Sequence, residues 1–363
     1  MKRTLLTVTI LALALLSAGA KTPGRKYVEA SDLTLVGKLF PNTPNPYHRV
    51  DTCIYKGFTN SENLQVRESS GISVAFKTNS SYITLVTDFA YYNESPSNIT
   101  GYASRGYDLY IREGGKWVWA ASCDGVPKKG DEVTIIRSMD GSEKECLLYL
   151  PLFAELSSVQ IGVQKNATIE AAPNPFRYRI GIFGSSYTHG ASTSRSGMPY
   201  PAQLSRFTGL QFLSLGCSGN SKLQPYFARA LAAADVDALV FDSFSNPSAE
   251  MIEERLFSFI ETIQESHPDI PLIFMQTIQR PSREFNSERE KFEADKMEMA
   301  DRLMKQAVKK YKNVYWIPET KTWVNDEYMA TVDGTHPDDY GYYLWAKSVE
   351  KPIVKILSKY GIK

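Results

Sequence analysis

The sequence predicts an α/β protein of two domains: a β-sandwich of jelly-roll type, then a domain in which helices cover both faces of a mainly parallel sheet. Three observations predict this architecture. The chain has 363 residues, a length that suits two domains of ordinary size. Residues 27–175 have the pattern of short strands. Beyond residue 175, short apolar strands alternate with amphipathic helices.

The N-terminus has the pattern of a secretory signal peptide. Lys2 and Arg3 precede an apolar run at 5–16, and small residues follow at 18–20, which is the order that signal peptidase recognises. The apolar run is about half of the ~20 residues that a membrane span needs. We therefore expect cleavage after Ala20, export to the periplasm or the extracellular space, and no stable membrane anchor in the mature protein.

The charge balance excludes one class of partner. The chain holds 41 basic and 40 acidic residues, a net charge of +1. Loss of Lys2 and Arg3 with the signal peptide leaves 39 basic and 40 acidic residues, a net charge of −1. A protein without a basic excess is poorly suited to neutralise a phosphate backbone, so we expect no binding to nucleic acid.

The cysteines and histidines predict no metal site. The four cysteines lack the spacing of metal ligands, and the four histidines are scattered along the chain. Cys123 and Cys146 flank a predicted hairpin, and they either form a disulfide or are small buried apolar residues. The state of Cys53 and Cys217 is open, as is the oligomeric state.

Residues 21–175 are expected to form the β-sandwich. Turn-forming clusters separate runs rich in β-branched and aromatic residues, and residues 70–165 show no helical period. The predicted strands include 72–76, 82–86, 107–111, 117–119 and 159–163. Trp117 and Trp119 share one face of a strand, and this face is either buried or a platform for a sugar.

Residues 176–363 are expected to form the α/β domain, after a linker at 171–175. Its strands are almost continuously apolar, which is typical of a parallel sheet covered on both faces. The predicted strands are 179–183, 213–215, 238–241, 272–275 and 314–317. The clearest helix spans 249–265, where apolar residues recur on one face, and a charged helix follows at 284–312.

Four loops of this domain carry polar residues that are suited to catalysis: 184–190, 216–220, 242–247 and 333–337. Three of them follow a predicted strand, and the fourth precedes the last helix. Ligands bind beyond the carboxyl ends of the strands in an open α/β sheet, so we expect all four loops at one edge. Together they hold a hydroxyl, backbone N–H groups, an amide, an imidazole and a carboxylate, which are the groups that acyl transfer requires.

Ser186, His336 and Asp333 are the predicted catalytic residues. A serine hydroxyl needs a base to take its proton as it attacks, and His336 is the histidine with a carboxylate three residues away. Asp333 is expected to accept a hydrogen bond from the other imidazole nitrogen and so fix the tautomer. The backbone N–H groups of Ser186 and Gly219 and the side-chain amide of Asn246 are expected to stabilise the oxyanion.

Residues close to these motifs in the sequence are candidates for lining the substrate pocket. They are Tyr187, Arg195, Trp323 and Tyr340. Core packing or surface stacking is the competing interpretation for each of them. His189 follows Ser186 by three residues and is expected to lie at the pocket or at the surface.

Residues 178–356 resemble the SGNH (GDSL-type) hydrolases. The four residues that give the family its name match Ser186, Gly219, Asn246 and His336, in the family's order. The aspartate three residues before the histidine matches as well. The one departure is Ser185, which stands where the G-D-S block of the family has an aspartate, and it is open whether Ser185 replaces that residue's role.

A second resemblance concerns residues 106–110, which read G-Y-D-L-Y and resemble the G-x-D-L-Y motif of a domain that precedes such hydrolases. Together the resemblances imply a flavodoxin-like three-layer α/β/α fold, no cofactor, and a serine esterase similar to carbohydrate O-acetylesterases. The partner is then an acylated carbohydrate or another small ester. Two alternatives stay open: a lipase, thioesterase or acyltransferase for longer acyl chains, and a carbohydrate-binding protein whose hydrolase domain is degenerate.

Overall fold

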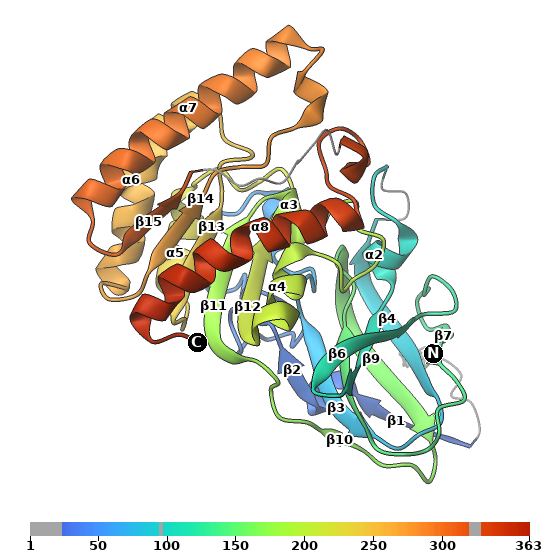
Figure 1. Ribbon diagram of the computed structural model, residues 1–363. Coiled ribbons are helices and arrows are strands. Elements are labelled where there is room, and N and C mark those ends of the chain that lie inside the picture. The colour runs from blue at the N-terminus through green and yellow to red at the C-terminus, as the bar shows by residue number, and fades with distance from the viewer. Residues whose placement is uncertain (1–23, 94–96, 319–327) are drawn as a thin grey trace, which may run out of the picture.

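A computed structural model describes residues 24–93, 97–318 and 328–363 (Figure 1). The predicted signal peptide and Trp323 lie outside the described residues. A β-rich N-terminal part lies beside a C-terminal part in which helices flank a sheet. No helix of the described part is both long and apolar enough to cross a membrane.

The N-terminal part is a sandwich of two antiparallel sheets, which confirms the predicted β-sandwich. The first sheet has the order β1 (Arg25–Glu29), β9 (Ala154–Gln164), β4 (Ile83–Tyr92) and β7 (Glu132–Ile136). The second has the order β10 (Ile169–Ala171), β3 (Ser73–Thr78), β8 (Lys144–Tyr149), β5 (Asp108–Glu113) and β6 (Lys116–Ser122), and β2 (Thr34–Val36) also pairs with β3. Both sheets contribute to one core, whose side chains include Phe76, Leu85, Leu109, Leu148 and Ile161.

Helices also occur in the N-terminal part. The helix α2 (Gly101–Arg105) falls within residues 70–165, where the sequence shows no helical period, and Thr100 caps it by accepting a hydrogen bond from the backbone N–H of Ala103. The expectation of strands alone is wrong here, because a helix of five residues is too short to display a period of 3.6. The other short elements are η1 (Ala30–Asp32) and α1 (Asn60–Gln65).

Five parallel strands form the sheet of the C-terminal part. Their order is β12 (Leu210–Gly216), β11 (Arg177–Gly184), β13 (Ala238–Asp242), β14 (Leu272–Met275) and β15 (Val314–Ile317), which is the 2-1-3-4-5 order of flavodoxin-like folds. One face packs against α4 (Tyr200–Thr208) and α8 (Asp339–Leu357), and the other against α5 (Pro225–Ala232), α6 (Ala249–Ser266) and α7 (Ser287–Lys310) (Figure 1). The predicted three-layer architecture is confirmed.

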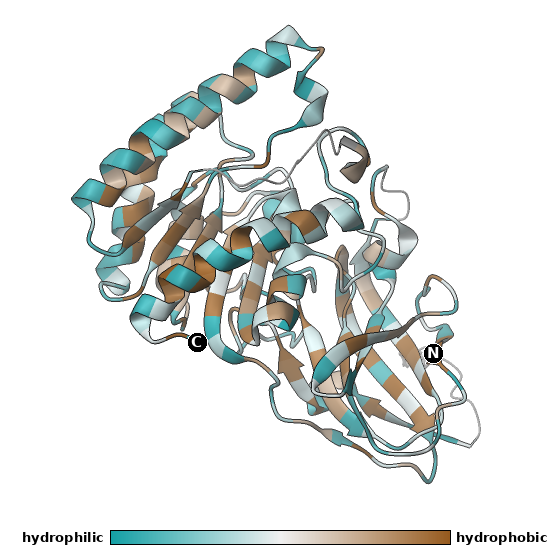
Figure 2. Ribbon diagram, in the orientation of Figure 1, coloured by the Kyte–Doolittle hydropathy of each residue, from teal (hydrophilic) through white to brown (hydrophobic). Residues whose placement is uncertain are grey.

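The two long helices of the outer layer begin at capping side chains. Ser248 caps α6 and Asn286 caps α7 by accepting backbone N–H groups of the first turn. The helix α7 is shorter than the predicted 284–312, because a 3-10 turn, η2 (Pro281–Arg283), precedes it and Tyr311 has an extended conformation. Figure 2 shows hydrophobic residues concentrated on the strands and many hydrophilic ones along α7. The remaining short elements are α3 (Ser186–His189), η3 (Tyr328–Ala330) and η4 (Ser358–Tyr360).

A segment that precedes most of the sandwich in the sequence packs against the C-terminal part. Leu39, Val50 and Val66 belong to the same buried core as Phe183 of β11 and Leu215 of β12. This segment, residues 39–66, therefore covers the sheet next to α5. The two parts of the chain share a hydrophobic core, and their relative positions follow from that packing.

Asp108 of the 106–110 motif joins the two parts through polar contacts. Its buried carboxylate accepts hydrogen bonds from Trp119 Nε1 (2.6 Å), Gly197 N (3.0 Å) and Arg195 Nε (3.2 Å). A Cβ on Gly197 would stand 2.5 Å from Asp108 Oδ2, so this close approach requires glycine. Burial raises the pKa of Asp108 to about 6, although Arg195 acts in the opposite direction.

The two tryptophans of β6 are not buried in the core of the sandwich. Trp119 is half-exposed, donates to Asp108, and lies under the Arg195 guanidinium at 4.9 Å from the ring centroid. Trp117 packs on a small apolar cluster that also contains Ala202 of α4. Both rings therefore lie at the contact between the two parts rather than in the core of the sandwich.

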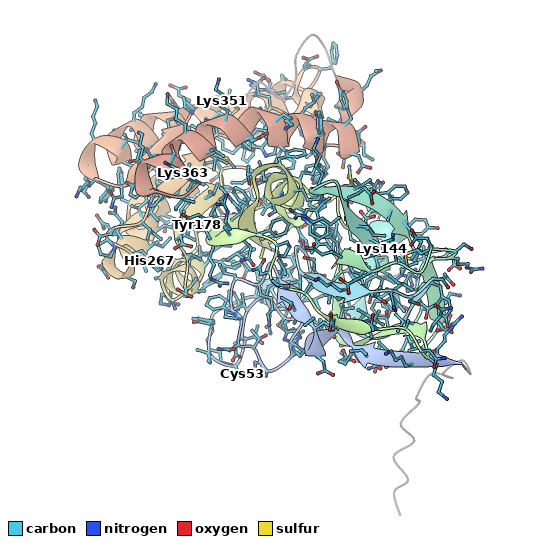
Figure 3. All side chains as sticks on the ribbon, turned by 60° about the horizontal axis from the view of Figure 1, so that its bottom comes forward. Cys53, Lys144, Tyr178, His267, Lys351 and Lys363 are labelled. Carbon is cyan, nitrogen blue, oxygen red and sulfur yellow. The ribbon has the colours of Figure 1, made fainter. Side chains whose placement is uncertain are left out.

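All four cysteines are free. Cys123, Cys146 and Cys217 are buried, whereas Cys53 lies at the surface (Figure 3). Burial raises the pKa of Cys146 and of Cys217 to about 12. These thiols therefore stay protonated at neutral pH and act as small apolar residues.

Candidate active site

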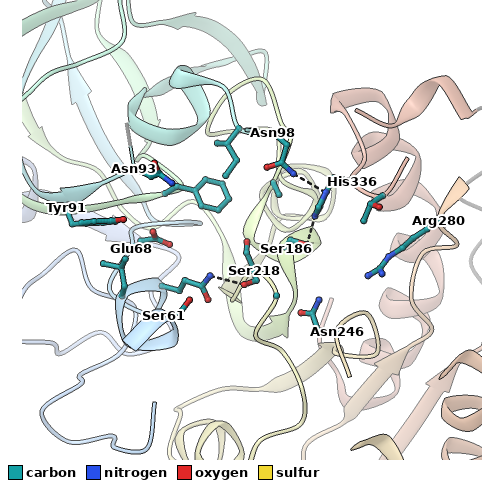
Figure 4. Close-up of a pocket in the computed structure, with 17 residues that line it drawn as sticks. Ser61, Glu68, Tyr91, Asn93, Asn98, Ser186, Ser218, Asn246, Arg280 and His336 are labelled. Atoms are coloured by element: carbon teal, nitrogen blue, oxygen red, sulfur yellow. Dashed lines mark hydrogen bonds between the residues drawn. The ribbon is translucent and has the colours of Figure 1, made fainter. Parts of the chain in front are cut away.

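The predicted loops meet at the carboxyl edge of the parallel sheet and surround a cavity of about 550 Å³ (Figure 4). Ser186, Gly219, Asn246 and His336 all line it, although they are far apart in the sequence. Both parts of the chain contribute to its wall. Its further lining residues are Ser61, Leu64, Gln65, Glu68, Tyr91, Asn93, Asn98, Ile99, Phe153, Ala191, Ser218, Arg280 and Thr335.

Ser186, His336 and Asp333 form one row of hydrogen bonds. His336 Nε2 lies 3.0 Å from Ser186 Oγ, and His336 Nδ1 lies 2.8 Å from Asp333 Oδ2. A carboxylate only accepts, so Nδ1 carries the proton and Nε2 faces the hydroxyl with its lone pair. This is the arrangement in which an imidazole takes a proton from serine.

A tight loop holds Asp333 against the histidine. Asp333 Oδ1 accepts the backbone N–H of Thr335 (3.0 Å) and of His336 (2.7 Å), and Gly334 between them has a φ of +71°. Partial burial would raise the pKa of Asp333, but the hydrogen bonds from His336 outweigh it and lower the pKa to about 2. Asp333 is therefore a carboxylate at neutral pH.

Ser185 acts as the cap of the short helix that begins with Ser186. Its hydroxyl accepts a hydrogen bond from Tyr187 N at 3.2 Å. A carboxyl group also reaches this helix, but it comes from β13, the neighbour of β11 in the sheet. Asp242 Oδ2 accepts a hydrogen bond from Thr188 Oγ1 at 2.9 Å. Burial raises the pKa of Asp242 to about 7. The residue before the nucleophile thus serves a local backbone role here.

The amide of Asn246 has a defined orientation. Its Oδ1 accepts the backbone N–H of Ser221 at 3.2 Å, so Nδ2 is the atom left to donate into the cavity. Two cations hold the preceding residue, since Arg280 Nη2 (2.9 Å) and the buried Lys296 Nζ (3.1 Å) both donate to the carbonyl oxygen of Ser245. Both form ion pairs with the same carboxylate, that of Glu293, and this support was not predicted.

Glycine at 219 has a left-handed backbone conformation. No protein atom lies within 4 Å of the place where a Cβ would stand, but φ is +73°. The left-handed backbone conformation, rather than a clash inside the protein, therefore selects glycine.

None of the three predicted pocket residues that the structure describes lines the cavity. Tyr187 is fully buried, where its hydroxyl donates to Thr335 O and accepts from Arg280 Nε. Arg195 is engaged with Asp108 at the contact between the two parts. Tyr340 is half-exposed on α8 and does not line the cavity. Trp323 lies outside the described residues.

His189 lies in the interior and does not line the cavity or the surface. It is fully buried, and Phe153 stacks on its ring at a centroid distance of 4.1 Å. Burial lowers the pKa of His189, so its imidazole is neutral at neutral pH. Among the residues that the structure describes, no group of three or more His, Cys, Asp or Glu side chains is arranged to hold a metal ion.

Asn98 of the N-terminal part reaches the catalytic row, and no sequence pattern indicated it. Its Nδ2 lies 3.1 Å from Asp333 Oδ2 and 3.2 Å from His336 Nδ1. Because Nδ1 already donates to Asp333, the amide donates to the carboxylate. Asn98 O accepts from Ser192 Oγ, which fixes the loop against the C-terminal part.

We expect the substitution Asn98→Ala to lower kcat for ester hydrolysis about tenfold, because Asp333 loses a donor and orients His336 less well. Asn98→Asp should move the acid limb of the pH profile of kcat/KM upward by about one unit, because a second negative charge stabilises the imidazolium. Stopped-flow or spectrophotometric assays across pH 4–9 measure both effects.

Asn166→Asp is the matched control, since it adds the same charge at an exposed turn of the same sandwich. This variant should have the same pH profile of kcat/KM as the wild type. An unchanged acid limb in Asn98→Asp, with folding intact, would show that Asn98 does not act on the histidine.

The comparisons with known proteins agree with this geometry. Residues 177–354 match the GDSL-like Lipase/Acylhydrolase family, and residues 25–169 match the model of the N-terminus of SGNH-hydrolase-type esterases. A solved structure described as a GDSL-like lipase from Bacteroides ovatus is 38% identical, with a TM-score of 0.86, over 92% of this chain and 98% of the other. Comparison with the curated proteins found no match.

Two more distant structures share the fold. A salicylyl-acyltransferase from a tetracycline biosynthetic pathway is 18% identical, with a TM-score of 0.72, over 93% of this chain and 98% of the other. A family two carbohydrate esterase from Cellvibrio japonicus is 11% identical, with a TM-score of 0.58, over 92% and 98%. The extent of the first match and the two family models lead to one conclusion: the chain belongs to the GDSL-like lipase/acylhydrolase family, with the N-terminal domain of the SGNH-type esterases.

Proposed function

We propose that this protein is an exported serine esterase that hydrolyses O-acyl esters of carbohydrates, with O-acetyl groups as its main substrate. The observation that carries the proposal is the row Ser186–His336–Asp333, with contacts of 3.0 and 2.8 Å, at the wall of an open cavity. Membership of an acylhydrolase family supports the reaction class. The N-terminal segment with the pattern of a signal peptide supports export.

The first half of the reaction follows from the geometry. Ser186 Oγ attacks the acyl carbon while His336 Nε2 takes its proton, and Asp333 stabilises the imidazolium that forms. Negative charge moves to the former carbonyl oxygen, to which Asn246 Nδ2 and the backbone N–H groups of Ser186 and Gly219 donate hydrogen bonds in this proposal. The C–O bond to the sugar then breaks, and the imidazolium protonates the leaving alcohol oxygen.

The second half regenerates the enzyme. Water enters the position of the alcohol and gives a proton to His336 Nε2 as its oxygen attacks the acyl carbon. Collapse of the second tetrahedral intermediate breaks the bond to Ser186 Oγ, which recovers its proton from the histidine. The acid, acetate in the proposed case, leaves. No step requires a cofactor.

The lining of the cavity supports a short acyl group on a polar alcohol. Many of its side chains carry hydroxyl, amide or charged groups, including Ser61, Gln65, Glu68, Asn93 and Asn98. A long acyl chain needs a continuous apolar wall to bury its methylene groups. Among the proteins of similar fold, one is named a carbohydrate esterase, which supports the same class of alcohol.

We expect kcat/KM for nitrophenyl esters to fall by about tenfold or more between acetate and octanoate, because polar side chains such as Gln65 and Glu68 interrupt the apolar lining that would bury added methylene groups. A spectrophotometric series from two to ten carbons measures this. Acetate release from acetylated xylan, pectin, mannan and sialoglycan then identifies the carbohydrate.

Each alternative predicts another result. A preference for acyl chains of eight carbons or more would indicate a lipase, thioesterase or acyltransferase. Absence of turnover on every acetylated substrate, together with no labelling of Ser186 by a fluorophosphonate, would indicate a binding protein with a degenerate site.

A further inference from the structure

Glu68 brings a buried carboxylate to the wall of the cavity. Its exposed fraction is 5%, and it lines the cavity on the side of the N-terminal part, opposite Arg280 (Figure 4). Its Oε2 is shielded from solvent and has no hydrogen-bond partner among the residues that the structure describes, so Oε1 is the oxygen left to face the cavity. Burying a carboxylate without hydrogen-bond donors costs several kcal/mol of free energy. Glu68 therefore needs hydrogen-bond donors from outside the protein.

Two cationic or polar neighbours surround Glu68 without satisfying it. The buried guanidinium of Arg49 contributes a favourable charge, but its own hydrogen bonds go to the carbonyl oxygens of Glu68 (2.8 Å) and Gln65. His189 Nε2 lies 3.1 Å from Glu68 Oε2 and 2.9 Å from Leu152 O. Only the second contact has the geometry of a hydrogen bond, so the Nε2 proton is directed at Leu152.

The state of His189 decides what Ser218 offers to the cavity. The imidazole is neutral and carries its proton on Nε2, so Nδ1 is an acceptor. Ser218 Oγ lies 3.1 Å from Nδ1 and must donate its proton there. Toward the cavity, Ser218 therefore presents lone pairs, next to the carboxylate of Glu68.

The cavity is thus polarised. Around Ser186 the wall offers donors, namely Asn246 Nδ2 and the backbone N–H groups, which suit a carbonyl oxygen. On the other side, Glu68 and Ser218 offer acceptors, which suit hydroxyl hydrogens. Tyr91, whose ring is 42% exposed, also lines this side and gives a flat apolar surface of the kind on which a sugar ring stacks.

We propose that Glu68 and Ser218 form a subsite for the alcohol part of the substrate, which accepts hydrogen bonds from free hydroxyl groups next to the ester. The ligand class is a polyol that is acylated at one position and unmodified at its neighbours. This inference rests on the proposed ester hydrolysis, and it adds that the enzyme selects partly acylated alcohols over fully substituted ones.

The test compares two small acetates: 1-O-acetylglycerol, with two free hydroxyls, and its 2,3-di-O-methyl ether, which has no hydroxyl donor and carries two added methyl groups. The wild type should hydrolyse the first with a kcat/KM at least tenfold above the second. Glu68→Gln should reduce this ratio at least fivefold, and Ser218→Ala should also reduce it. Glu265→Gln, an exposed position on α6, is the control and should leave the ratio unchanged.

A ratio near one in the wild type would overturn the subsite, as would a ratio that both variants leave unchanged. Ser218→Ala keeps the test decisive where Glu68→Gln does not fold, as judged by circular dichroism. Hydrolysis of neither acetate, with turnover of octanoate esters, would instead overturn the proposed acetyl specificity. The octanoyl esters of glycerol and of its dimethyl ether are then compared in the same way. The ratio of their kcat/KM values tests the subsite independently of the acetyl specificity.

Discussion

Ser186→Ala is expected to lower kcat for 4-nitrophenyl acetate by about 10⁴-fold or more, with the fold intact. The alanine removes the only atom that forms the covalent bond, and His336 and Asp333 then have no hydroxyl to activate. The Ser186 side chain is small and at the cavity wall, where its exposed fraction is 7%. Its loss therefore leaves no void in the core.

The measurement has two parts. Initial rates give the loss of activity, and circular dichroism with a thermal melt shows whether the variant is folded. Ser266→Ala, at the exposed end of α6, is the control and should retain full activity. A residual rate within tenfold of the wild type would remove Ser186 from the mechanism. Ser218, another cavity hydroxyl with a histidine partner, would then be the candidate nucleophile.

Asp108→Ala is expected to lower the free energy of unfolding by about 2–3 kcal/mol, because a buried carboxylate is removed and its partly exposed ion-pair partner, Arg195, is left. The carboxylate has no exposed surface, and it joins Trp119 of the sandwich to Arg195 and Gly197 of the C-terminal part. The variant leaves three donors unsatisfied at the contact between the two parts. We therefore expect these parts to separate at lower denaturant concentration.

Guanidinium unfolding, followed by tryptophan fluorescence, measures the change, because Trp119 reports directly on this contact. Asp131→Ala, at an exposed position of the same sandwich, should stay within about 0.5 kcal/mol of the wild type. Equal unfolding midpoints for Asp108→Ala and Asp131→Ala would contradict the role of Asp108 in joining the two parts.

The polar edge of the sheet was predictable from local patterns. Apolar runs such as 238–241 predict buried strands, and the residues that follow each strand must reach the same edge once the sheet is parallel. This rule brings Ser186 near Gly219 and Asn246, whereas the loop of His336 follows η3 rather than a strand of the sheet and reaches the same edge just before α8. The N-terminal part adds to the triad one donor, Asn98 Nδ2 to Asp333 Oδ2, which these patterns do not indicate.

The contacts between the two parts were not predictable. Asn98, Glu68 and Tyr91 carry no motif that relates them to a serine nucleophile, yet all three line the cavity. Arg195 stands close to the active-site loop in the sequence, and its side chain points to Asp108 instead. The position of a residue in the sequence does not fix where its side chain points, because a residue of another domain can bind that side chain.

Sequence by itself determined the two classes of sheet and the edge at which the polar loops meet, and it predicted a nucleophile, a base and oxyanion donors there. These follow from short-range patterns: periodicity decides which residues are buried, and strand ends decide which residues meet. Tertiary structure alone decided that Asn98 and Glu68 of the N-terminal part line the cavity, and that Tyr187 is a buried support. Those properties depend on how two separately patterned surfaces dock, and docking is set by side-chain packing over residues far apart in the chain.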